Sequence, residues 1–82
     1  MSEIAFKKSV FKDLKRIDKA VLKRILDKLE NDLLKGPDDF PELKGKFAGL
    51  RKYRVGDYRV IYAILEKQVL ITRVSHRKEA YD

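Results

Sequence analysis

The chain has 82 residues, which is enough for one small domain, and we expect a single domain over residues 1–82. Its 20 lysines and arginines against 13 aspartates and glutamates give a formal net charge of +7, and an apolar content of 44% excludes a disordered tail. It has no cysteine and no apolar run longer than residues 60–65, so a disulfide scaffold, a zinc finger, a thiol nucleophile and a membrane-spanning helix are excluded.

The first residues predict a short strand rather than a leader segment. Ile4 and Phe6 alternate with Glu3, Ala5 and Lys7, which indicates a strand with one buried side. The first eleven residues also lack the charged-then-apolar order of a signal peptide. We therefore expect a soluble protein that stays in the cytoplasm.

Two helices are predicted next, because apolar residues recur at helical spacing as far as Leu33. Ser9 and Asp18 are suited to cap helices over residues 9–17 and 18–35, and the Gly36-Pro37 pair ends the second one. The lysines of these helices lie mostly off the apolar stripe. A solvated helix face is the expected explanation for them, with docking to RNA as the alternative.

The second half of the chain predicts three strands after a linker over residues 37–49, in which Phe40, Leu43 and Phe47 are candidate anchors. The β-rich runs are residues 50–55, 58–65 and 68–74, separated by Gly56-Asp57 and Glu66-Lys67. The order β-α-α-β-β-β predicts an α+β fold. Two N-terminal helices should pack on one face of a small, mainly antiparallel sheet.

The predicted register separates apolar residues from basic ones. A two-residue turn at Gly56-Asp57 places Val55 opposite Tyr58 and Arg54 opposite Arg59. Side-chain alternation then gives the helices one apolar face to cover. That face holds Tyr53, Val55, Tyr58, Val60, Tyr62, Ile64, Val69 and Ile71. The opposite face holds Lys52, Arg54, Arg59, Ile61, Ala63, Leu65 and Leu70.

The pairing of Arg54 with Arg59 predicts an anion site. Like charges directly opposite each other weaken a sheet, and a phosphate held by both guanidinium groups would offset that cost. The same register places Val74 opposite Arg59, so the segment of Ser75, His76 and Arg77 should leave the sheet beside the pair. We therefore expect the cations to converge with His76 and Tyr81.

His76 and Tyr81 are candidates for proton transfer, although a plain surface histidine and a packed tyrosine are the alternatives. No pair of acidic residues lies near this cluster to hold a metal ion, and Asp57 is more typical of a turn. The expected chemistry is therefore metal-free acid–base work, with arginines that stabilise a phosphorane-like state and with no cofactor.

Residues 50–62 (LRKYRVGDYRVIY) and 74–82 (VSHRKEAYD), with the LKG turn at residues 43–45, resemble the RelE/ParE superfamily of bacterial and archaeal toxins. The resemblance covers essentially the whole chain. It implies a toxin that enters the ribosomal A site and cuts messenger RNA by attack of a ribose 2′-hydroxyl on the adjacent phosphate.

The resemblance also implies roles for individual residues. Arg59 and Arg77 match arginines that stabilise the phosphate, and Lys52 and Arg54 match residues that contact the RNA or take part in catalysis. Tyr81 matches the tail tyrosine that orients the base or moves a proton, although some branches use a histidine near the position of His76. We add Arg51 and Lys78 to the candidate RNA contacts.

Two further functions remain open at this point. ParE-type toxins share the fold but poison DNA gyrase, and a small RNA-binding module without catalysis would have the same charge. Superfamily members are normally neutralised by an antitoxin whose tail wraps the toxin. An acidic antitoxin would suit the net charge of +7 and the apolar patch of Ile61, Ala63 and Leu65.

Overall fold

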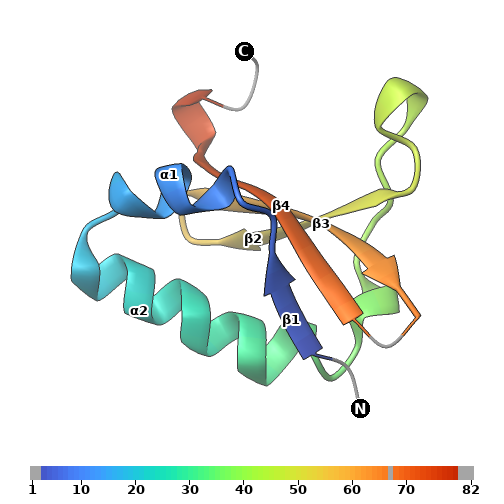
Figure 1. Cartoon of the computed structure of the whole chain (residues 1–82), viewed down its shortest axis with the longest axis horizontal. Coiled ribbons are helices and arrows are strands. Elements are labelled where there is room, and N and C mark those ends of the chain that lie inside the picture. The colour runs from blue at the N-terminus through green and yellow to red at the C-terminus, as the bar shows by residue number, and fades with distance from the viewer. Residues whose placement is uncertain (1–2, 67, 80–82) are drawn as a thin grey trace.

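The computed structural model describes residues 3–66 and 68–79, and it has the element order that the sequence predicts (Figure 1). The strands and helices are β1 (Glu3–Phe6), α1 (Val10–Lys15), α2 (Lys19–Lys28), β2 (Leu50–Val55), β3 (Tyr58–Leu65) and β4 (Gln68–His76). A π-helical turn (Leu29–Leu33) continues α2, and short 3₁₀ turns lie at Pro37–Asp39, Gly45–Phe47 and Arg77–Glu79. None of the helices described is long and apolar enough to span a membrane.

The four strands form one sheet in the order β1-β4-β3-β2, so β1 and β2 are its edges. The β2–β3 and β3–β4 pairs are antiparallel, whereas β1 runs parallel to β4. This confirms the α+β prediction with a mainly antiparallel sheet. The first strand joins the last one because the two helices carry the chain across one face before β2 begins.

The helices cover the face of the sheet that the sequence assigns to them. Val10, Ile17, Ile25, Leu29 and Leu33 are buried against one side of the strands, and that side is called the covered face here. Its buried residues are Tyr53, Val55, Val60, Tyr62, Val69, Ile71 and Val74. Two predicted members lie at its margins, since Tyr58 is half-buried and Ile64 is 36% exposed.

The β3–β4 register contains a bulge that the sequence analysis did not predict. Leu65 pairs with Gln68 across the expected two-residue turn, and Tyr62 pairs with Ile71. Ile61, however, pairs with Arg73, which leaves Thr72 as an extra residue in β4. Arg73 and Val74 therefore point to the opposite faces from those that the predicted register gives them.

The face turned away from the helices is called the basic face. Two cross-strand rows define it: Lys52, Ile61 and Arg73, and beside them Arg54, Arg59 and Ser75. Arg54 and Arg73 are exposed, while Lys52 and Arg59 are half-buried.

The helix ends differ from the predictions in one of two caps. Asp18 caps α2 as expected, because its extended backbone (ψ 140°) lets Oδ2 accept the Ala20 N–H at 3.2 Å. Ser9 makes no side-chain cap. Its backbone already lies in the helical region (φ −64°, ψ −21°), so its hydroxyl is not placed to reach the next turn.

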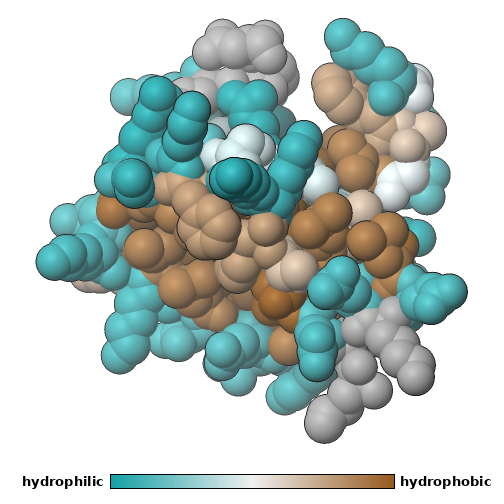
Figure 2. Space-filling model, viewed as in Figure 1, coloured by the Kyte–Doolittle hydropathy of each residue, from teal (hydrophilic) through white to brown (hydrophobic). Residues whose placement is uncertain are grey.

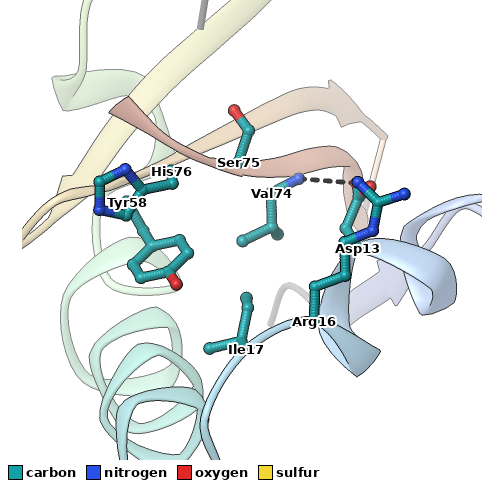
Figure 3. A pocket seen from close by; sticks show the side chains of 7 residues that line it. All are labelled: Asp13, Arg16, Ile17, Tyr58, Val74, Ser75 and His76. Carbon is teal, nitrogen blue, oxygen red and sulfur yellow. Dashed lines mark hydrogen bonds between the residues drawn. The ribbon is translucent and has the colours of Figure 1, made fainter. Parts of the chain in front are cut away.

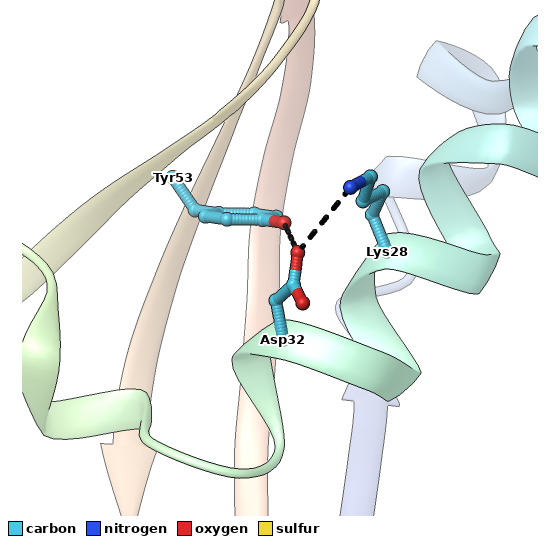
Figure 4. Close-up of polar contacts among 3 residues, drawn as sticks. All are labelled: Lys28, Asp32 and Tyr53. Carbon is cyan, nitrogen blue, oxygen red and sulfur yellow. Dashed lines mark hydrogen bonds and ion pairs between the residues drawn. The ribbon is translucent and has the colours of Figure 1, made fainter.

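The second predicted helix changes geometry after Lys28. The π-helical turn that follows keeps Leu29 and Leu33 buried and closes with a hydrogen bond from the Leu34 N–H to the Leu29 carbonyl. It also brings Asp32 beneath the sheet, where Oδ2 accepts the Tyr53 hydroxyl at 2.9 Å and lies 3.7 Å from Lys28 Nζ (Figure 4).

The linker after α2 is fastened to the sheet at its start. The Phe40 ring contacts the Tyr53 ring edge-on at 4.7 Å, which confirms Phe40 as an anchor, and Leu43 is half-buried. Phe47 was predicted to anchor the linker as well, but it is 50% exposed because it lies in a 3₁₀ turn that projects from the sheet.

Candidate nucleic-acid interface

The paired arginines lie where the sequence analysis predicts. Gly56-Asp57 forms a two-residue turn, so Arg54 pairs with Arg59 across β2 and β3. A positive φ of 57° at Gly56 explains why a glycine begins this turn. The turn thus fixes two guanidinium groups on neighbouring strands of the basic face.

The bulge corrects the predicted position of β4. Ser75 pairs with Arg59, and Val74 pairs with Val60 on the covered face, so the prediction that Val74 lies opposite Arg59 was wrong. β4 also runs on to His76 rather than ending at Val74. The extra residue Thr72 is the physical reason, because one additional residue in a strand reverses the alternation that follows it.

His76 consequently lies on the covered side of the sheet, opposite Tyr58, and not beside Arg59. Its ring meets the Tyr58 ring edge-on with centroids 5.2 Å apart (Figure 3). Its Nδ1 accepts the Lys78 N–H at 3.2 Å. These two contacts hold the ring at the start of the tail.

His76 and Tyr58 line a small pocket between the end of β4 and α1 (Figure 3). Asp13 of α1 and Arg16, the residue after α1, form its other side, and Asp13 Oδ2 accepts the Val74 N–H at 3.2 Å. Its volume of about 30 Å³ has room for a few waters at most, so it does not hold a nucleotide base. The Asp13 contact instead attaches α1 to β4 where β1 has ended.

The tail beyond β4 is tied to the β2–β3 turn. The Arg77 N–H donates to the Asp57 carbonyl at 2.7 Å, and Arg77 Nε lies 3.8 Å from Asp57 Oδ1. Both side chains are more than 60% exposed. Arg77 and the neighbouring exposed Lys78 therefore lie at the same end of the sheet as Arg54 and Arg59. Tyr81 lies outside the described residues.

Arg51, proposed from the sequence as an RNA contact, does not belong to the basic face. It pairs with Tyr62 on the covered side, and its guanidinium donates to the carbonyls of Phe40 at 2.7 Å and Asp38 at 3.2 Å. The Tyr62 hydroxyl donates to the Pro37 carbonyl at 2.6 Å. These contacts satisfy the carbonyls of the linker and hold it to the sheet, and the contact of Arg51 with RNA stays a prediction.

Arg73 is the basic residue that sequence reasoning missed. Without a bulge it would oppose Val60, which is fully buried under the helices. A charged side chain there would carry a large desolvation cost, and that conflict was the signal for an extra residue in the strand. With the bulge, Arg73 is exposed on the basic face.

Two tyrosines of the covered face have raised pKa values. Burial, the hydrogen bond to Asp32 and the charge of Asp32 raise the pKa of Tyr53 to about 12. Burial is also the main cause that raises the pKa of Tyr62 to about 12. Within residues 3–66 and 68–79, no three His, Asp or Glu side chains gather as metal ligands.

Comparisons with known proteins agree on one family. The model of the ParE toxin of the type II toxin–antitoxin system parDE matches residues 4–81. The structure is similar to a chain of the RelBE2 toxin–antitoxin complex of Mycobacterium tuberculosis, at 28% identity and a TM-score of 0.86, covering 93% of this chain and 98% of that one.

Two archaeal complexes are also similar to this chain. For the RelE–RelB complex of Pyrococcus horikoshii the identity is 31%, the TM-score 0.68, and the coverage 95% of this chain and 97% of that one. For the RelB–RelE complex of Methanococcus jannaschii the identity is 30% and the TM-score 0.72, and the match covers 94% of each chain. No curated protein matches the chain.

Proposed function

Because the chain belongs to the ParE toxin family within the RelE/ParE superfamily, and so is a toxin of a toxin–antitoxin pair, we propose that it cuts messenger RNA on the ribosome. The cut lies in the A-site codon. The observation that carries the proposal is the basic face, on which Arg54 and Arg59 are opposed and Arg77 lies at the same end of the sheet.

The proposed reaction is an internal transfer of the phosphate. The ribose 2′-oxygen forms a bond to the adjacent phosphorus while the bond from phosphorus to the 5′-oxygen breaks. One proton leaves the 2′-hydroxyl and one is added to the 5′-oxygen, which gives a 2′,3′-cyclic phosphate and a 5′-hydroxyl. No co-reactant is needed. Arg59 and Arg77 stabilise the negative charge on the phosphate, and Lys52, Arg54 and Lys78 position the RNA.

His76 and Tyr81 are the two candidates for moving these protons. The side of the sheet on which His76 lies, and its contacts with Tyr58 and Lys78, support a role in anchoring the tail. We therefore assign proton transfer to Tyr81, with His76 as the alternative. A phenol that both gives and accepts a proton is suited to this step.

An antitoxin partner is part of the proposal. The similar chains from three organisms belong to complexes of a toxin with its antitoxin. A groove of about 540 Å³ lies between β1 and α2. Its lining is Ile4, Phe6, Leu26, Leu29 and Leu34 together with Glu3 and Glu30, and the apolar part supports a partner with apolar side chains. Figure 2 shows apolar side chains gathered across this part of the molecule. The net charge of +7 favours an acidic partner.

The test is cleavage of a defined messenger RNA with and without programmed ribosomes. The wild type should cut within the A-site codon only when ribosomes are present. Arg59→Ala should lose that activity. Arg59→Lys, which keeps the charge and most of the aliphatic part of the side chain, shows whether a folding defect causes the loss of activity in Arg59→Ala. Arg24→Ala, an exposed change on α2, is the matched control. Comparison of Tyr81→Phe with His76→Ala identifies the proton carrier. Intact RNA from a protein that still stops growth would overturn the proposal.

Gyrase poisoning is the second candidate, and the match to the ParE family model favours it. It predicts that Arg59→Ala leaves toxicity intact and that growth arrest follows DNA breaks while messenger RNA stays whole. A non-catalytic RNA-binding module would instead bind RNA in a salt-sensitive way and cause no growth arrest. The cleavage assay together with a DNA-break assay separates the three functions.

A further inference from the structure

The bulge at Thr72 is fixed by contacts on both sides of β4. The Thr72 hydroxyl donates to the Ile61 carbonyl at 3.1 Å, next to the point where the register shifts. On the other side, β1 pairs with β4 only as far as Ile71, and Asp13 then accepts the Val74 N–H. The position of Arg73 is therefore set by the fold and not by a loosely paired strand end.

The bulge extends the basic face across a third strand. Lys52 and Arg73 flank Ile61 in one row, and Arg54 and Arg59 lie in the next row, two residues away. Two residues along a strand span about 6.7 Å, so the rows have room for one phosphate each. Arg73 is the only contribution of β4 to the positive charge of the first row.

Arg73 has no structural task among the described residues. Its side chain is exposed, and within residues 3–66 and 68–79 it makes no hydrogen bond or ion pair. It also lies diagonally across from Arg59, where a like charge is mildly unfavourable for the sheet. A bound anion removes this cost, and the planar guanidinium group of arginine is suited to bind a phosphate with two hydrogen bonds.

We propose that Arg73 and Lys52 together bind a second phosphate of the RNA, next to the phosphate that Arg54 and Arg59 contact. This inference rests on the proposed function and deepens it. The substrate is then a single strand of RNA whose backbone runs along the strand direction over the basic face, from one row to the next, and Arg73 is a positioning residue. It adds binding energy in the ground state and in the transition state alike, so its loss raises KM more than it lowers kcat.

The test compares Arg73→Ala, Arg73→Lys and the control Arg24→Ala, which removes an equal charge from α2 on the other side of the sheet. A short single-stranded RNA is titrated by fluorescence anisotropy at several salt concentrations, and cleavage on programmed ribosomes is measured in parallel. Arg73→Ala should bind less tightly, with a salt slope reduced by about 0.7, and Arg73→Lys should keep the slope. Arg24→Ala should match the wild type.

The role of Arg73 and the proposed function fail by different results. If the wild type binds and cleaves RNA and Arg73→Ala equals it in affinity, slope and KM, the role of Arg73 is wrong and the proposed function stands. If the wild type neither binds nor cleaves RNA, the proposed function fails and this inference fails with it. An equal loss in Arg73→Ala and Arg24→Ala also overturns the inference, because it would show only a dependence on net charge.

Discussion

The two faces of the sheet are built from the same strands and have opposite compositions. On the covered face, Val60, Tyr62, Val69 and Ile71 are fully buried. On the basic face, the alternate positions of those strands carry Lys52, Arg54, Arg59 and Arg73. Burial of the first set supplies the stabilisation, because apolar surface removed from water contributes about 25 cal/mol per Å². The exposed members of the second set, Arg54 and Arg73, add little to that burial and are available for binding, and four substitutions test this division.

The largest effect is expected on the covered side. Ile25→Ala empties a site that is 0% exposed, and it should lower the free energy of unfolding by about 2–5 kcal/mol. Urea denaturation followed by circular dichroism measures the loss. Leu65→Ala, at a position that is 46% exposed, is the matched control and should cost much less. Equal losses in the two variants would mean that the helices do not bury Ile25 as described.

On the basic side, activity and stability should separate. Arg77→Ala removes a side chain that is 68% exposed, so the free energy of unfolding should change by less than about 0.5 kcal/mol. Cleavage on programmed ribosomes should nevertheless fall by about 10²–10³-fold, which is typical for the loss of one group that stabilises a developing charge. A thermal melt and single-turnover kinetics measure both quantities. A variant with full activity would remove Arg77 from the site.

The contact between Tyr53 and Asp32 predicts a pH-dependent stability. Tyr53→Phe should cost about 1 kcal/mol at pH 7, because one hydrogen bond is lost. The pKa of Tyr53 rises from 10.0 to about 12 on folding, so its stabilisation is complete below pH 10 and is lost as the pH rises towards 12. The gap in unfolding free energy between wild type and Tyr53→Phe should therefore narrow across that range. A gap that stays constant would contradict the assigned cause.

The smallest effect has the opposite sign. Arg54→Thr removes a like charge from opposite Arg59 and introduces a residue that favours strands, so it should stabilise the protein by about 0.2–1 kcal/mol. The same change should weaken RNA binding. Chemical denaturation and an RNA titration check the two effects together. A variant that is less stable than the wild type would show that the arginine pair is not a burden on the sheet.

The fold was predictable from sequence wherever a local signal determines it. Gly56-Asp57 sets the β2–β3 register, and with it the pairing of Arg54 with Arg59, because a two-residue turn allows few alternatives. Asp18 marks the start of α2 in the same local way. The alternation of apolar residues then identified the covered face, since a strand has only two faces to choose between.

The candidate site was predictable only as far as β3. The bulge at Thr72 depends on tertiary contacts with Ile61 and on the Asp13 contact with Val74, and neither is visible in a local pattern. It moves His76 to the covered side and brings Arg73 to the basic face. The contacts of Arg51 on the covered side were not predictable for a similar reason, because the carbonyls it satisfies belong to a linker more than ten residues away.

The parallel pairing of β1 with β4 has a consequence for the order in which the protein assembles. Residues 3–6 are synthesised long before their partners, residues 68–71 of β4. A pairing so distant in sequence forms late, and a chain made from its N-terminus cannot complete this sheet until β4 has emerged. The strand that closes the sheet also carries Arg73. The sheet, and with it the third strand of the basic face, is therefore completed only once β4 has been made.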